Sequence, residues 1–101
     1  MADLTDNNPI TANGDYDLNL RPGRWWALSA SSNFSGGTIT VKYENASAGF
    51  TTYTDSDDNN ITFAADGGEF CFVPSPGKVR FSLAASTSPS INIGYTEEVG
   101  G

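Results

Sequence analysis

The sequence contains no histidine and only one cysteine, Cys71. Without histidine, the chain lacks the most frequent general base and the imidazole that most often binds metal ions. These counts exclude zinc sites made of cysteine and histidine ligands, and a single cysteine cannot form a disulfide within the chain. We therefore expect a protein of this size to be held together by its core or by association with other chains.

Catalytic groups are equally scarce. Cys71 lies between two phenylalanines, and such an apolar setting raises the pKa of a thiol and leaves it unreactive. Two carboxylates can hydrolyse glycosides, but the densest acidic cluster, Asp55, Asp57 and Asp58, falls in a predicted solvated loop where nothing raises the pKa of one carboxyl group. We expect no enzymatic activity, no catalytic residue and no cofactor.

Basic residues and long apolar runs are also few. The chain has 5 Lys and Arg against 12 Asp and Glu, whereas binding to a phosphate backbone requires clustered basic residues. No apolar run approaches the roughly 20 residues that span a bilayer. The first residues, MADLTDNNPITANGD, have neither the charged nor the apolar region of a secretory signal. We expect synthesis in the cytoplasm, with no nucleic-acid and no membrane partner.

Helical periodicity is almost missing, and short runs that alternate between apolar and polar residues take its place. This pattern predicts an all-β fold, an antiparallel β-sandwich that is jelly-roll-like or a related Greek key, with about eight short strands. We expect a sandwich domain over residues 15–96, an extended N-terminal arm over 1–14 and a short tail over 97–101. The predicted strands are 15–20, 24–31, 38–43, 50–54, 60–64, 69–73, 78–84 and 91–95.

The arm is polar except for Leu4 and Ile10. Terminal segments of this kind are usually frayed. The alternative interpretation is that these two side chains become ordered on a neighbouring subunit, as segments that fold on binding do.

Two adjacent tryptophans follow the turn RPG. Because neighbouring side chains of a strand point to opposite faces, only one of them belongs to the core. Alternation places Trp26 inward with Leu28 and Ala30, and Trp25 outward beside Ala27. The outward position of Trp25 therefore predicts that this face of the sheet contacts another molecule and not only water.

The segment DSDDNNITFAAD has a spacing similar to that of a calcium-binding loop, with Asp55, Asp57 and Asn59 at alternate positions. The context differs, because Asn60 occupies the position of the required glycine and a strand is predicted to follow. A solvated acidic hairpin is the favoured interpretation, and an incidental divalent-ion site at its tip is the alternative.

The outward faces of the predicted strands carry small and hydroxylated residues with few charges, and EFCFV is apolar on both faces. A sheet that faces only water carries more Lys and Glu. We therefore expect part of the outer surface to be covered, either by the arm or by another subunit.

The segments RPGRWWAL, GGTITVKY, FVPSPGKVRFSLAAS and SINI together resemble the small β-sandwich virion proteins of tailed bacteriophages. The resemblance covers about residues 15 to 95, and some of these proteins decorate the outside of capsids. It implies a capsid decoration or cement protein that is located on the exterior of the virion. Its expected partners are the major capsid protein and further copies of itself, as a dimer or trimer.

The contact residues expected for this role are Leu4, Ile10, Arg21, Arg24 and Trp25. The two arginines can meet acidic capsid patches through forked hydrogen bonds, or they are ordinary exposed charges of a turn.

A fibre tip or adhesin that recognises a host surface carbohydrate is the alternative function. An aromatic ring can stack on a sugar, and this function requires exposed aromatic side chains gathered at one end of the sandwich. Besides Trp25, the sequence offers Phe34, Phe50 and Tyr53 for such a cluster.

Overall fold

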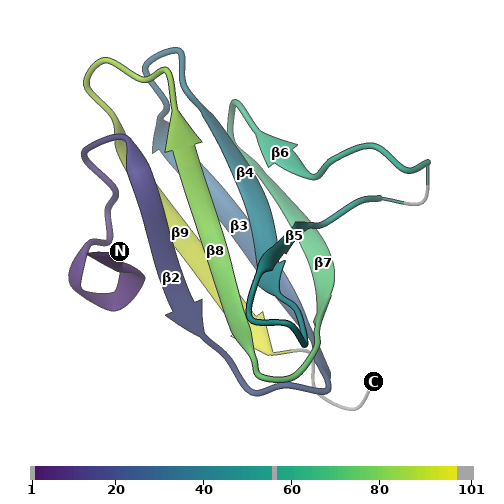
Figure 1. Ribbon diagram of the computed structural model, residues 1–101. Helices are drawn as coiled ribbons and strands as arrows, with labels where there is room; N and C mark the ends of the chain where they lie inside the picture. Colours follow the sequence, from purple (N-terminus) through teal and green to yellow (C-terminus); the bar gives the residue numbers. More distant parts are fainter. Residues whose placement is uncertain (1, 56, 98–101) are drawn as a thin grey trace.

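The chain forms two β-sheets that pack face to face (Figure 1), in a computed structural model that describes residues 2–55 and 57–97. Sheet A has the strand order β1-β2-β8-β4-β5, with β6 also paired to β4, and sheet B has the order β7-β3-β9. The strands are β1 (Ala2–Asp3), β2 (Gly14–Asn19), β3 (Arg24–Asn33), β4 (Thr38–Glu44), β5 (Phe50–Thr52), β6 (Thr62–Phe63), β7 (Gly67–Val73), β8 (Lys78–Ala84) and β9 (Ser90–Glu97).

This architecture confirms the predicted antiparallel sandwich, and β2 to β9 correspond one by one to the predicted strands. Successive strands β2, β3 and β4 lie alternately in sheets A and B. Strand β7 then joins sheet B, β8 inserts between β2 and β4, and β9 returns beside β3. These crossings between two sheets make the fold jelly-roll-like.

Period-2 alternation builds the core. In β8, Val79, Phe81 and Leu83 are buried between the sheets, while the residues between them lie on the outer face of sheet A. Strand β3 follows the predicted register, with Leu28 and Ala30 buried. Trp26 packs against the same core, and its indole N–H donates to the carbonyl of Arg21 over 3.1 Å.

The N-terminal segment differs from the prediction of an extended arm. Strand β1 pairs in parallel with β2, a 3-10 turn covers Leu4–Asp6, and Ile10 forms a β-bridge with Ile91 of β9. Leu4 and Ile10 are fully buried in the chain's own core. The expectation that they contact a neighbouring subunit is therefore wrong, because β2 and β9 leave one side of the sandwich open and these side chains fill it.

Asn8 extends this closure with a side chain. Its amide Nδ2 donates to the Ile93 carbonyl over 2.9 Å, and its Oδ1 accepts the Ile93 N–H over 3.0 Å. The amide therefore satisfies both backbone groups of an edge residue, as a neighbouring strand would. Ile10 continues the ladder through two backbone hydrogen bonds with Ile91, of 2.8 and 3.0 Å.

On the opposite side of the sandwich, the edge strand of sheet A is interrupted. The strands predicted at 50–54 and 60–64, on either side of the acidic hairpin, were expected to pair with each other. In the described part of the chain, they are joined by the single bridge between Thr54 and Asn60. Strands β5 and β6 each pair with β4 instead. The hairpin 54–60 between them extends beyond the sheets at the right of Figure 1.

Glu97, the first residue of the predicted tail, is the last residue of β9, and residues 98–101 lie outside the described part of the chain. Among the described residues, no helix is long and apolar enough to cross a membrane.

We predict that Leu4→Ala lowers the free energy of unfolding by about 2 to 5 kcal/mol, because it leaves a cavity in the core. Thr11→Ala, an exposed position in the same segment, should change it by less than about 0.5 kcal/mol. Thermal and denaturant unfolding of the three proteins measure both effects. An unchanged melting temperature for Leu4→Ala would restore the interpretation of a loosely attached arm.

Candidate functional site

The outer face of sheet B carries a group of exposed aromatic side chains, which we call the aromatic patch: Trp25, Phe70 and Phe72. Their exposed fractions are 53%, 60% and 42%. Most large apolar side chains of a small domain are buried, so three neighbouring exposed rings require an explanation.

Cross-strand register brings these rings together. Trp25 of β3 lies opposite Phe72 of β7, and Ala27 lies opposite Phe70. The centroids of the Trp25 and Phe72 rings are 5.7 Å apart, with an edge-to-face angle of 66°. Such a pair adds about 0.5 to 1.5 kcal/mol beyond its area burial. The ring contact therefore holds both side chains in position at the surface.

Small uncharged residues continue this face beside the patch. Ser29 lies opposite Gly68 of β7 and Gly94 of β9. A Cβ atom at Gly94 would lie 2.5 Å from Ser29 Oγ, so a side chain there would displace the Ser29 hydroxyl. A shallow depression of about 280 Å³ follows this row next to Phe70. The outer face of sheet B thus combines rings with a flat, uncharged floor.

The outer face of sheet A has the opposite chemistry. Arg80 of β8 pairs with Asp17 of β2 through two hydrogen bonds, of 2.7 and 3.2 Å, and its guanidinium lies 3.6 Å from the centre of the Phe50 ring. The hydrogen bond with Asp17 is the main reason why the pKa of Arg80 is raised. This charged network suits a face that stays in water.

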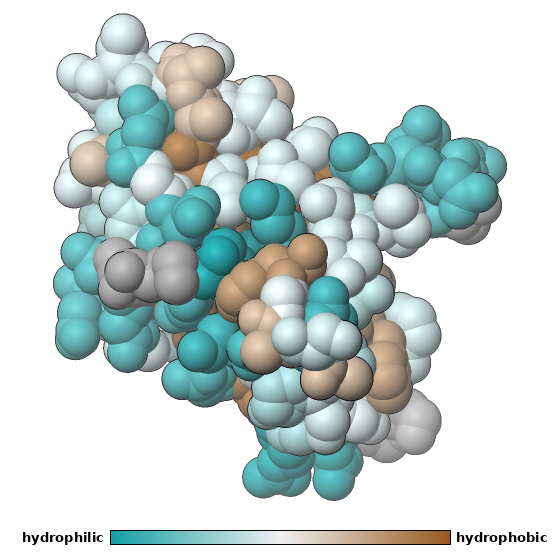
Figure 2. Space-filling model, viewed as in Figure 1, coloured by the Kyte–Doolittle hydropathy of each residue, from teal (hydrophilic) through white to brown (hydrophobic). Residues whose placement is uncertain are grey.

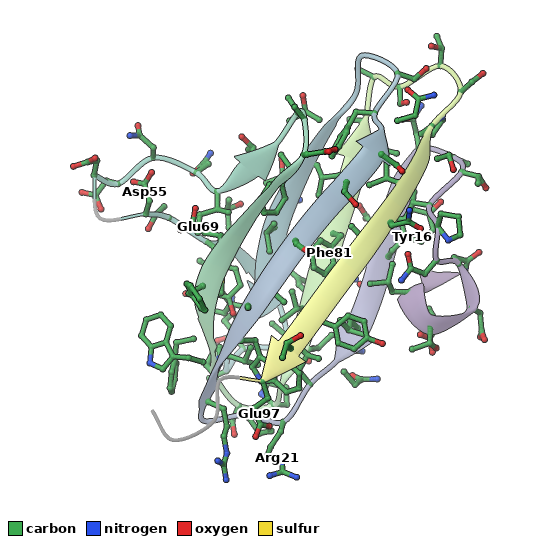
Figure 3. All side chains as sticks on the ribbon, turned by 180° about the vertical axis from the view of Figure 1, so that it is seen from behind. Tyr16, Arg21, Asp55, Glu69, Phe81 and Glu97 are labelled. Carbon is green, nitrogen blue, oxygen red and sulfur yellow. The ribbon has the colours of Figure 1, made fainter. Side chains whose placement is uncertain are left out.

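Arg21 and Arg24 lie at the end of sheet B where β9 ends, and both contact Glu97 (Figure 3). Arg21 Nε is 3.7 Å from Glu97 Oε1, and Arg24 Nη1 is 3.9 Å from Glu97 Oε2. The arginine side chains remain 65% and 49% exposed. Such exposed pairs add little stability, so these guanidinium groups remain accessible at this end of the sandwich, whereas Trp25 points to the outer face of sheet B.

A groove of about 520 Å³ separates the aromatic patch from the edge of sheet A. Its walls come from β7 on one side and from β5 with the start of the hairpin on the other, and its lining includes no charged residue. The residues lining it are Trp25, Tyr43, Thr51, Thr52, Tyr53, Thr54, Ile61, Phe70, Cys71, Phe72 and Pro74.

Two buried titratable side chains lie at the base of this groove. The Tyr53 hydroxyl donates to the Phe72 carbonyl over 2.7 Å and so links the two sheets. Burial raises the pKa of Tyr53. Burial, followed by the nearby charge of Glu69, raises the pKa of Cys71 to about 12. Both groups are neutral at physiological pH.

The three candidate ion ligands lie at the hairpin, which appears as a hydrophilic lobe at the right of Figure 2. Asp55 Oδ1 accepts the N–H groups of Asp57 and Asn59 over 2.9 and 3.0 Å, so this carboxylate closes the turn. Among the described residues, no three His, Cys, Asp or Glu side chains are grouped closely enough to hold a metal ion.

The predicted cluster of loop aromatics does not form. Phe34 and Tyr53 are buried in the core, and Phe50 covers Arg80 on sheet A. Of the predicted contact residues, Arg21 and Arg24 come together at Glu97, and Trp25 lies on the outer face of sheet B. Leu4 and Ile10 are buried at the other side of the sandwich. The sequence did not single out Phe70 and Phe72, although the two apolar faces of EFCFV indicated a covered surface.

No protein-family model, no curated protein and no solved structure significantly matches this chain. The candidate site therefore rests on geometry alone. An exposed aromatic patch on an uncharged sheet face is suited to non-covalent docking on a partner surface.

The buried thiol gives a prediction about pH. The pKa of Cys71 is raised from 9.0 to about 12 in the folded chain, so folding keeps a proton that the unfolded thiol releases. This contribution to stability is complete below about pH 9 and is lost as the pH rises towards 12. The stability difference between wild type and Cys71→Ala should therefore shrink across this range in denaturant unfolding. A difference independent of pH would contradict the raised pKa.

Proposed function

We propose that this chain is a non-enzymatic virion protein that decorates the outside of a tailed-phage head and stabilises the shell through subunit contacts. The major capsid protein is the proposed partner, and the outer face of sheet B is the docking surface. The observation that carries this proposal is the aromatic patch of Trp25, Phe70 and Phe72 beside a floor without charges.

Aromatic residues and arginine are enriched in the buried centres of protein interfaces, and charged residues are depleted there. Each large aromatic side chain covers about 150 to 250 Å² when buried. The rings of the patch supply an apolar centre, and the exposed Arg21 and Arg24 lie at one end of the same sheet. This arrangement supports docking on another protein.

The chemical difference between the two sheets gives the proposed orientation. Sheet B faces the shell, while sheet A, with the Arg80 and Asp17 network, faces the solvent. A domain that binds the assembled shell and not the separate subunits stabilises the shell by linkage. No chemical step is needed for this mechanism. The proposal includes self-association on the shell as a dimer or trimer.

A carbohydrate-binding fibre tip is the second candidate, favoured by one observation. The groove next to Trp25 and Phe70 is also lined by Thr51, Thr52 and Thr54, whose hydroxyl groups can hydrogen-bond to a sugar. Against this function, the rings of Trp25 and Phe72 meet at 66°, so they do not form one flat stacking platform.

We predict that Trp25→Ser weakens binding to expanded phage shells by about 30-fold, which corresponds to about 2 kcal/mol for a central aromatic contact. The melting temperature should fall by no more than several degrees, because the Trp25 side chain is half exposed and loses mainly its ring contact with Phe72. Cosedimentation with shells measures the binding. Tyr95→Ser is the control, since Tyr95 is also exposed but lies opposite Leu28 on the other face of sheet B.

A charge placed on each sheet gives an independent comparison. Ala27→Glu on sheet B should abolish shell binding, whereas Thr40→Glu on sheet A should leave it intact; both positions are partly exposed. Equal effects of the two substitutions would contradict the proposed orientation.

Mass spectrometry of purified particles should find a copy number of the same order as that of the capsid subunit. A few copies per particle, with glycan binding that Trp25→Ser abolishes, would favour the fibre tip.

A further inference from the structure

Strand β7 leaves one of its two backbone edges open. The Phe72 carbonyl accepts from the Tyr53 hydroxyl, away from β3, whereas the Val73 carbonyl accepts the Gly23 N–H at the start of β3. Because the N–H and C=O of a strand residue point to the same side and alternate along the chain, Phe70 and Phe72 direct their backbone groups outward. Within the described residues, no acceptor pairs with either of these N–H groups.

The corresponding edge at the other side of the sandwich is covered. Asn8 and Ile10 satisfy the outer edge of β9, and β1 pairs with the outer edge of β2. Natural proteins protect open edges with lysine, proline, bulges or a covering segment. Strand β7, with the sequence GGEFCFV, contains neither lysine nor proline. The Tyr53 hydroxyl occupies the Phe72 carbonyl, and the rest of this edge stays available for pairing.

Space for a pairing strand exists next to this edge. The groove of about 520 Å³ runs between β7 and the strand β5 with the start of the hairpin. A strand placed there would send alternate side chains in two directions. One set would lie beside Phe70 and Phe72 on the outer face. The other set would enter the groove towards Tyr43 and Ile61.

We propose that β7 accepts an extended, basic peptide segment of the partner protein as an added antiparallel strand. This inference rests on the proposed docking role of sheet B and specifies how the partner is held. Main-chain hydrogen bonds to Phe70 and to the N–H of Phe72 supply affinity, since the Phe72 carbonyl is held by the Tyr53 hydroxyl. Alternate apolar side chains supply selectivity, as in other cases of strand addition.

Charge identifies the chemistry of the segment. Glu69 is exposed on β7, and Thr54, at the wall of the groove, leads directly into Asp55, Asp57 and Asp58. Figure 3 shows Glu69 and Asp55 towards the same end of β7, opposite the end that holds Arg21 and Glu97. Lysine or arginine near this acidic end complements it. A second copy is disfavoured as the occupant, because each chain has a net charge of -7.

The test compares Phe70→Pro with Phe70→Ala. Both variants remove the ring, but only proline removes the outward N–H, and β3 loses no ladder hydrogen bond because that N–H points away from it. The probe is a displayed library of short random peptides. We expect enriched peptides that alternate apolar residues with Lys or Arg, and binding to Phe70→Pro about tenfold weaker than to Phe70→Ala. Thermal unfolding verifies that both variants fold.

Three outcomes of the peptide and association measurements would overturn the strand addition. They are enriched peptides that bind both variants equally, the absence of enrichment, and concentration-dependent dimers that Phe70→Pro abolishes. The last outcome would identify a second copy as the occupant. If both variants weaken shell binding equally, the strand addition is contradicted but the docking role of sheet B is supported. If neither variant affects shell binding, both the strand addition and the docking role are contradicted.

Discussion

A sandwich of two open sheets has two sides where its core meets water, and the structure depends on how each side is closed. At the side of β2 and β9, the chain uses its own N-terminal segment, with Leu4 and Ile10 as fully buried plugs. Asn8 completes the closure, because its side-chain amide makes the two hydrogen bonds to the backbone of Ile93 that a neighbouring strand would make. At the side of β5 and β7, closure depends on Tyr53, whose hydroxyl bond to Phe72 joins the two sheets.

This difference between the two sides explains where the surface is unusual. Tyr53 and Ile61 exclude water from the core, but they do not cover β7, whose outer edge and rings stay exposed. The interruption of the edge strand after β5 adds to this exposure, because the hairpin 54–60 leaves sheet A after Thr54, which lines the groove. The groove and the open edge are thus two consequences of one incomplete closure, and the aromatic patch lies next to them on the outer face of sheet B.

Local alternation was sufficient to predict most of the fold. The pattern of residues 78–84 identified Phe81 and its neighbours as core, and the register of β3 separated Trp26 from Trp25. Non-local pairing was not predictable in the same way. No feature of residues 1–14 indicates that Ile10 meets Ile91, and β5 and β6 were expected to pair with each other because the preference of both for β4 is a long-range property.

The same limit applies to the candidate site. The alternation of EFCFV predicts that two apolar faces are present, but only the register between β3 and β7 places Phe72 against Trp25 and Phe70 beside Ala27. That register follows from the core, since Cys71 and Val73 must point inward. The residues that keep β7 in the fold therefore also fix its rings at the surface. A substitution that shifted the register of β7 by one residue would expose the thiol and bury the rings, and would lose core and docking surface together.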